Sequence, residues 1–374
     1  MAQSYTPGLK ILSRTKVIKI RLLPMKGSVH YKIGDMVHSN DIVASTDIPG
    51  NVQMLNVANK LNVEPENVPE CMLVKLDEEI TKGQIIAESK GIFGLFKSQL
   101  KSPINGTLAN VSEITGQVIL SEPPILVEVD AYTSGKIIEV IEDEGVTIAT
   151  EGAIVQGILG VGGENQGDLL LLTTSPNEEL THSMIKTEHK GKIIVGGSFI
   201  NLQTFEKAKD VGVKGIVSGG FNYTDLSKIL GYSLGVAITG SEEIGPSLII
   251  TEGFGRIDMA SQTYKLLKEN ENKFASINGS TQIRAGVIRP EILIPFENMD
   301  EMSEEYDDAD LAISEGSSIR VIRAPFFGRV GTVKSLPHEL IKMESETLVR
   351  VAEIEFKDGS IGVIPRANLE MILI

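Results

Sequence analysis

The chain has 374 residues, a formal net charge of −15, a hydrophobic fraction of 41% and one cysteine, Cys71. This length exceeds what one hydrophobic core usually organises, so roughly two to four domains are expected. A lone cysteine excludes an internal disulfide and favours a reducing, cytoplasmic location. The negative charge disfavours sequence-independent binding to phosphate backbones, and no run of residues has the length and apolarity of a membrane span. We therefore expect no membrane association and no strong sequence-specific DNA binding.

The first half predicts a turn-rich β domain over residues 1–125. Lys16–Leu23 mixes basic and apolar residues as a strand does, and two similar phrases follow at Tyr31–Ala44 and Val74–Ala87. Each phrase has a turn, a polar loop and a short strand that ends in Ala. A further phrase, Ser102–Leu108, has the form Ser-Pro-x-x-Gly-x-Leu, in which Asn105-Gly106 suits a tight hairpin turn.

These phrases, within Leu22–Leu120, resemble the barrel-sandwich hybrid, the fold of biotinyl and lipoyl carrier domains. Related domains occur in the largest subunit of bacterial RNA polymerase and at the N-terminus of some electron-transfer subunits. A carrier lysine would lie on the turn between the phrases, yet Glu88–Leu100 is longer than that turn, and neither Lys90 nor Lys97 has the flanking residues of an attachment site. We expect no cofactor, and we interpret the Phe-bearing loop as a hydrophobic plug.

Between the two phrases, Gly50–Met72 predicts a short helix followed by an extended segment that contains prolines. Residues 126–189 predict more strands, which we interpret as a β-rich connecting domain.

The pattern changes to α/β over residues 190–296. Strand-like runs at Lys192–Val195, Gly215–Val217, Gly235–Ile238 and Leu248–Thr251 alternate with helix-like runs at Leu202–Val211, Tyr223–Leu230 and Asp258–Asn270. Short connections in this order predict parallel strands with right-handed crossovers. We expect a small Rossmann-like or swivelling parallel sheet, followed by return strands.

Glycines follow the predicted strands, and the carboxyl ends of parallel strands share one rim where ligands bind. Glycine at a rim lets backbone N–H groups approach an anion, and an arginine supplies a counter-charge. The alternative is that Gly and Ser meet the needs of tight turns. The candidate ligand-binding residues are Gly196, Gly197, Ser198, Gly219, Gly220, Gly240, Gly253 and Arg256.

Residues 297–316 predict an acidic linker, because 297–310 contains eight acidic residues and no basic one. One interpretation is a solvated spacer that keeps the last domain away from the body. The other is a competitor for basic surfaces of a partner.

The last stretch, residues 317–374, predicts a small curled β-barrel. Ile319–Val333 resembles the KOW motif, the strand–loop–strand of NusG-type transcription factors and several ribosomal proteins, and the family's glycine falls on Gly331. Later strands meet at the turn Lys357-Asp358-Gly359. The resemblance implies an SH3-like barrel that docks on RNA, ribosome or polymerase; the alternative is a packing or oligomerisation module. The candidate partner-binding residues are Arg320, Arg323, Phe326, Phe327, Arg329 and Arg366.

No catalytic chemistry can be read from the sequence. The five histidines are scattered without metal-ligand spacing, and no nucleophile elbow or phosphate loop occurs. We expect a mainly β protein with an embedded α/β unit that acts as a non-catalytic binding or scaffold factor of the transcription or translation machinery. The alternatives are an anion-binding protein or enzyme that uses the glycine rim, and a self-assembling structural protein.

Overall fold

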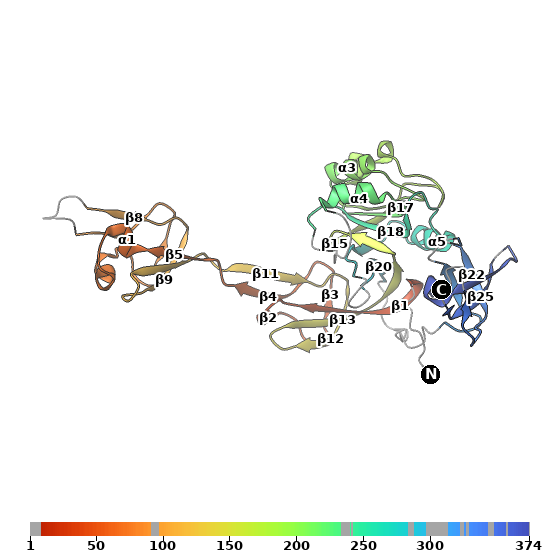
Figure 1. The fold of residues 1–374 in the computed structure, drawn as a ribbon, viewed down its shortest axis with the longest axis horizontal. Helices are drawn as coiled ribbons and strands as arrows, with labels where there is room; N and C mark the ends of the chain where they lie inside the picture. The colour runs from red at the N-terminus through yellow and green to blue at the C-terminus, as the bar shows by residue number, and fades with distance from the viewer. Residues whose placement is uncertain are drawn as a thin grey trace.

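The chain folds mainly into β-strands gathered in several sheets, one of which curls into a half-barrel. The computed structural model describes residues 9–90, 97–232, 240, 242–282, 288–296, 313–321, 325–326, 329–342, 348–356 and 358–373. Figure 1 shows an elongated molecule with a large body at one end and a small module at the other, joined by a narrow β connection. Among the described helices, none has the length and apolarity needed to cross a membrane.

The body is built on two long antiparallel strands, β1 (Leu9–Leu22) and β13 (Gly145–Gln156). β13 pairs with β20, and β14, which follows β13 closely in the chain, pairs with β18 at the other end of the same run of strands, so the sheet curls round one core. The predicted parallel arrangement is confirmed for β16 to β18, and β15, which the sequence placed in the connecting domain, extends it in parallel beside β16. The remaining strands of the run are β14 (Leu159–Val161), β15 (Glu164–Leu171), β16 (Ile193–Val195), β17 (Gly215–Phe221), β18 (Ser247–Phe254), β19 (Phe274–Asn278) and β20 (Glu291–Pro295).

Two predicted helices are confirmed to the residue: α3 (Leu202–Val211) and α4 (Tyr223–Leu230). Asn201 caps α3 by accepting a hydrogen bond from the Thr204 N–H, and Gly212 ends the helix at a φ of 84°. The third helix, α5 (Ser261–Glu269), is shorter at both ends than predicted. The predicted strand Gly235–Ile238 lies outside the described residues, and β17 pairs directly with β18.

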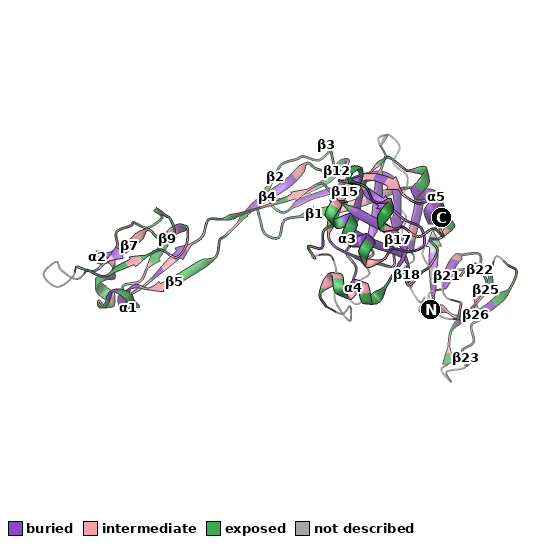
Figure 2. Ribbon diagram, turned by 90° about the horizontal axis from the view of Figure 1, so that it is seen from above, coloured by how far each residue is buried: buried purple, intermediate pink, exposed green. Residues whose placement is uncertain are grey.

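Helices cover both faces of the parallel strands. One face packs on α3 and α4 through residues such as Ile216, Phe205 and Leu226, and the other packs on α5 and the curled antiparallel strands through Val217 and Leu267. Figure 2 shows the buried residues concentrated in this part of the body. Two 3-10 helices, η2 (His182–Met184) and η3 (Thr187–His189), lie between β15 and β16.

A proximal module continues the long strands of the body. Its core combines Val37 and Val43 with Ala131, Ile137 and Ile148. Residues from both sides of the domain boundary predicted after residue 125 therefore pack together. Its strands are β2 (Ser28–Val29), β3 (Met36–Val37), β4 (Ile42–Ile48), β11 (Ile125–Asp130), β12 (Gly135–Ile141) and the start of β13.

The distal module, residues 49–124, is inserted between β4 and β11. Its core cluster draws only on residues 55–120, and its main sheet has the order β5-β10-β9-β6. The segment predicted to be extended instead forms helical turns, with Pro65 and Pro69 in their first turns. Its elements are β5 (Val52–Asn56), α1 (Val57–Leu61), η1 (Pro65–Asn67), α2 (Val68–Cys71), β6 (Glu79–Ile80), β7 (Ile85–Glu88), β8 (Gln99–Lys101), β9 (Gly106–Val111) and β10 (Gln117–Ser121).

The two similar phrases are structural repeats, one in each module. In the proximal module the Asp35 side chain accepts a hydrogen bond from the Lys32 N–H, and in the distal module Glu78 does the same for Lys75. The Ile137 N–H donates to Asp35 O, as the Leu108 N–H donates to Glu78 O. The repetition seen in the sequence therefore reflects two β modules with one hydrogen-bonding plan.

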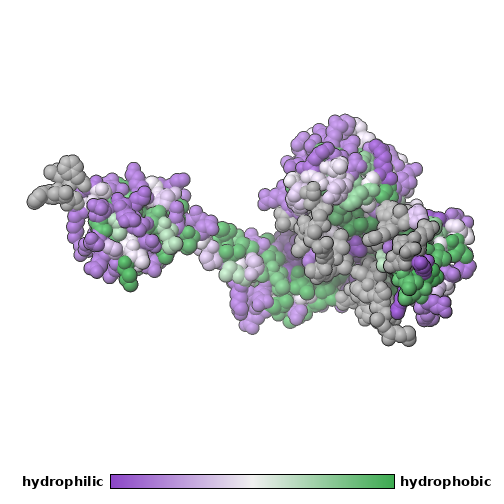
Figure 3. Space-filling model, in the orientation of Figure 1, coloured by the Kyte–Doolittle hydropathy of each residue, from purple (hydrophilic) through white to green (hydrophobic). Residues whose placement is uncertain are grey.

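The stalk, residues 42–56 with 117–130, is a two-stranded antiparallel ribbon that joins the two modules. β4 pairs with β11 and β5 pairs with β10, and the ribbon is interrupted at Pro49-Gly50 and Pro123-Pro124. At Gly50 a Cβ atom would lie 2.3 Å from Glu122 O, so the two segments of the ribbon approach each other closely there. Figure 3 shows apolar surface along the stalk and the lower body. The stalk contains four apolar residues that are each more than half exposed: Val52, Met54, Ile125 and Leu126.

The terminal module, whose described residues lie within 313–373, is an antiparallel meander with the order β27-β21-β22-β25-β26. Gly331 in β22 leaves space for Ile354 and for the backbone of Glu355, as the sequence predicted, and Asp358-Gly359 turns between β25 and β26. Its elements are β21 (Ser318–Val321), β22 (Val330–Ser335), β23 (Ile341–Lys342), β24 (Leu348–Val349), β25 (Val351–Phe356), β26 (Ile361–Pro365), η5 (Arg366–Asn368) and β27 (Leu369–Leu373).

The terminal module is not held away from the body. β27 pairs in parallel with the first residues of β1, and Met371 packs with Leu12, Val17 and Leu293 of the body. The interpretation of residues 297–316 as a spacer that separates the last domain is therefore wrong, although the acidic run 297–310 itself lies outside the described residues.

Candidate ligand and partner sites

The structure brings most of the predicted glycine rim together at the carboxyl ends of β16, β17 and β18. The Gly219 N–H donates to Gly197 O at 2.8 Å, and Gly220 is the register partner of Gly253. Gly196 and Ser198 lie beside them, because Gly196 donates to Val217 O and Ser198 O accepts from the Ile257 N–H. The prediction that these strand ends share one rim is correct for these residues.

Gly240 does not belong to this rim. A Cβ atom at Gly240 would contact Ser280, and the Gly240 N–H donates to Glu242, whose carboxylate also accepts from the Gly162 N–H. Gly162 follows β14, close to Ser247, the first residue of β18. Gly240 therefore lies at the amino end of β18.

The space in front of the rim glycines is filled by the chain's own backbone. A Cβ atom at Gly197 would lie 2.4 Å from Glu178 O, one at Gly219 would lie 2.2 Å from Ile257 O, and one at Gly220 would lie 1.9 Å from Gly255 O. Arg256 forms an ion pair with Glu179 and lies 4.8 Å from the centre of the Phe199 ring. The glycines thus serve close packing between the strand ends and two loops, a structural role that differs from the tight turns of the sequence interpretation.

Arg320 ties the terminal module to the body. Its guanidinium forms an ion pair with Glu252 of β18 and donates to Thr251 O at 3.2 Å, and both charged side chains are only 4% exposed. The other Glu252 oxygen accepts from the N–H of Ala260, which precedes α5. Arg320 is therefore a buried tie within the molecule, and its proposed place on a partner surface is wrong.

Arg366 also makes internal contacts. Its Nε donates to Val351 O and its Nη2 donates to Pro337 O, both at 3.0 Å, so the side chain fixes the corner between β26 and β27. Arg323 and Phe327 lie outside the described residues.

Among the predicted arginines within the described residues, Arg329 is the one that contacts aromatic rings and an exposed carboxylate. Its guanidinium lies 3.7 Å from the centre of the Phe356 ring and 5.8 Å from that of Phe326, and it donates to Asp358 at 2.7 Å and to Ser360. The side chain is 36% exposed. The pKa of the Asp358 carboxyl is lowered mainly by hydrogen bonds from Ser360, and the charge of Arg329 adds to this effect. We call Phe326, Arg329, Phe356 and Asp358 the Arg329 cluster.

Sequence reasoning did not find Glu252 or Phe356. Glu252 lies between Thr251 and Gly253 at a predicted strand end, where only Gly253 was predicted to be a site residue. An acid that ends an otherwise apolar strand could have indicated a buried partner of opposite charge.

Within the residues that the structure describes, no group of three His, Cys, Asp or Glu side chains lies close enough to hold a metal ion. No family model matches the sequence, and no curated protein matches it significantly.

Proposed function

We propose that this protein is a non-catalytic binding or scaffold factor that contacts the transcription or translation machinery through its terminal module. The Arg329 cluster carries the proposal, because it places a partly exposed guanidinium and the exposed Asp358 carboxylate at the edge of the aromatic core formed by Phe326 and Phe356. Arginine beside aromatic rings is a common recognition surface, since it combines charge, hydrogen-bond donors and flat apolar area.

The architecture of the terminal module supports the proposed KOW-like, SH3-like barrel. The KOW-like strands β21 and β22 are neighbours in an antiparallel meander, the close approach at Gly331 fits the family's glycine, and the short helix η5 precedes the closing strand β27. We propose in addition that the proximal and distal modules are tandem barrel-sandwich hybrids, which their shared hydrogen-bonding plan supports.

The shape of the molecule supports a scaffold more than an enzyme. The distal module reaches away from the body on a two-stranded stalk, and the stalk carries exposed apolar side chains such as Ile125 and Leu126. Grouped apolar side chains on a surface are typical of interaction sites. Two separate surfaces, one on the stalk and one on the terminal module, would let the protein hold partners apart.

The proposal is tested by affinity purification of the tagged full chain from its own cells, with and without nuclease, followed by mass spectrometry. We expect ribosomal or RNA polymerase subunits, enriched over a tag-only control. Recovery of this protein alone, or of metabolic enzymes, would contradict the proposal.

A further inference from the structure

The β1 strand has a bulge that folds the central ribbon of the body. Leu12 is opposite Ile154 and Thr15 is opposite Gly152, so three steps along β1 match two along β13. Lys19 is opposite Ile148 of β13, and Glu291 is opposite Gln156 of the same strand. Along a straight strand, Ile148 and Gln156 would lie about 26 Å apart. Lys19 and Glu291 nevertheless form an ion pair. The ribbon is therefore sharply bent at the bulge, with these two side chains on its inner side.

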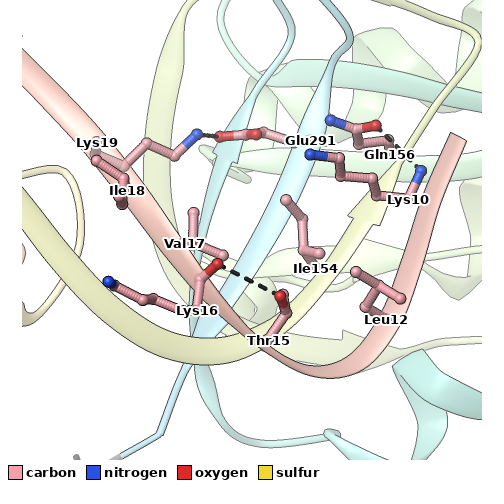
Figure 4. A pocket seen from close by; sticks show the side chains of 10 residues that line it. All are labelled: Lys10, Leu12, Thr15, Lys16, Val17, Ile18, Lys19, Ile154, Gln156 and Glu291. Carbon is pink, nitrogen blue, oxygen red and sulfur yellow. Dashed lines mark hydrogen bonds and ion pairs between the residues drawn. The ribbon is translucent and has the colours of Figure 1, made fainter. Parts of the chain in front are cut away.

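The bend encloses a pocket of about 220 Å³. Figure 4 shows the Lys19 ammonium meeting the Glu291 carboxylate, with the Lys10 side chain extending toward Glu291 from the other side. The Gln156 side chain is held in place because its Oε1 accepts a hydrogen bond from the Lys10 backbone N–H at 3.1 Å. The pocket is lined by Lys10, Leu12, Thr15, Lys16, Val17, Ile18, Lys19, Ile154, Gln156 and Glu291.

The pocket is positive in a chain whose net charge is −15. Lys10 and Lys19 extend toward the one lining carboxylate, Glu291, whereas the third lining lysine, Lys16, points away from it (Figure 4). Glu291 pairs with Lys19 and also accepts from the Tyr132 hydroxyl at 3.4 Å. The Glu291 and Lys19 side chains are only 9% and 22% exposed, so charge acts there through a medium less polar than water.

Tyr132 packs against this cluster and has a strained backbone conformation. Its φ is 63°, which is rare for a bulky residue, and its side chain is buried between Lys19 and Arg21, at 5.6 and 5.4 Å from the ring centre. Its carbonyl accepts from Ser276 and Gln166, which hold the backbone in this conformation. Burial raises the pKa of Tyr132 well above its usual value, and the Glu291 charge adds to this effect, so the hydroxyl stays protonated and can donate. Strain of this kind is found mainly where a site needs fixed geometry.

We propose that the bulge pocket is a binding site for a small anion that bears a carboxylate or phosphate group, held by Lys10, Lys19 and the Gln156 amide. The volume is below the roughly 300–1,000 Å³ of pockets that take drug-sized ligands, so the ligand is smaller than a nucleotide. The site is separate from the Arg329 cluster and from the glycine rim, and it goes beyond the proposed function.

The test is calorimetric titration of the full chain with inorganic phosphate and, separately, with succinate, at ionic strength fixed with sodium chloride. We expect saturable binding of at least one probe, and the two titrations distinguish phosphate from carboxylate recognition. Gln156→Glu keeps an acceptor for the Lys10 N–H but adds a negative charge, so it should weaken binding at least tenfold. Lys10→Gln should do the same by removing a positive charge.

Gln53→Glu is the matched control, since it makes the same change of charge on exposed β5 of the distal module and should leave the affinity unchanged. Circular dichroism establishes that each variant is folded, and Gln156→Glu keeps the test open if Lys10→Gln does not fold. Absence of saturable binding to both probes, or binding that Gln156→Glu leaves unchanged, would overturn the proposal.

Discussion

The two ends of the molecule are attached to it in opposite ways. The terminal module shares strand pairing, the buried residue Met371 and the Arg320–Glu252 ion pair with the body. The distal module has a core of its own and joins the rest through the two strands of the stalk. We infer that the terminal module loses stability with the body, whereas the distal module unfolds as a separate unit.

The largest expected effect comes from breaking the tie at the terminal module. Arg320→Ala leaves the Glu252 carboxylate buried without its partner and should lower the free energy of unfolding by about 3–5 kcal/mol. Denaturant unfolding measures the change. The double variant Arg320→Met with Glu252→Gln should recover much of it, because Gln still accepts from the Ala260 N–H and no charge is buried. A loss below about 1 kcal/mol in the single variant would show that the tie contributes little.

A matched change in the distal module should act locally. Leu120→Ala removes a fully buried side chain from the distal core and should cost about 3 kcal/mol there. Amide hydrogen exchange should show faster exchange throughout residues 55–120 and unchanged exchange in β16 and β17. Equal acceleration in the body would mean that the two units unfold together.

Excised fragments sharpen the same contrast. Residues 49–124 contain a complete core and should unfold with the midpoint that the distal module has in the full chain. Residues 313–374 lose the pairing of β27 with β1 and the burial of Met371, so their midpoint should fall below that of the parent. Thermal unfolding followed by circular dichroism compares the midpoint of each fragment with that of the full chain. A lowered midpoint for residues 49–124 together with an unchanged midpoint for residues 313–374 would refute the inferred difference in attachment.

The smallest effect on stability is expected in the Arg329 cluster. Arg329→Ala removes a surface ion pair with Asp358 and a contact over the Phe356 ring from a side chain that is itself partly exposed, and should cost no more than about 1 kcal/mol. Arg350→Ala, an exposed arginine of the same module, should change stability by less than about 0.5 kcal/mol. A large loss in Arg329→Ala would make the cluster a packing element and remove the support it gives to partner binding.

The elements that the sequence predicted well have a local cause. α3 and α4 have apolar residues at helical spacing and end at Gly212 and Gly231, both with positive φ, so their ranges follow from nearby residues alone. Gly331 and the Asp358-Gly359 turn were also found because their constraints are local.

What the sequence could not predict depends on which surfaces meet. Arg320 alternates with buried Ile319 and Val321 and therefore looks solvent-exposed, yet the body covers that side of β21. The same holds for the pocket at the β1 bulge, where the bend brings Lys10 and Lys19, from the two halves of β1, together with Glu291 of β20. Alternation identifies the face of a strand, but it does not say what covers that face.

The central claim, that the terminal module binds a partner through the Arg329 cluster, is tested most directly by quantitative affinity purification of three versions of the full chain. These are the unchanged protein, Arg329→Ala and Arg350→Ala, each shown by circular dichroism to be folded. We predict that Arg329→Ala lowers recovery of ribosomal or polymerase subunits at least fivefold while Arg350→Ala retains it. Equal recovery by all three versions would contradict the claim.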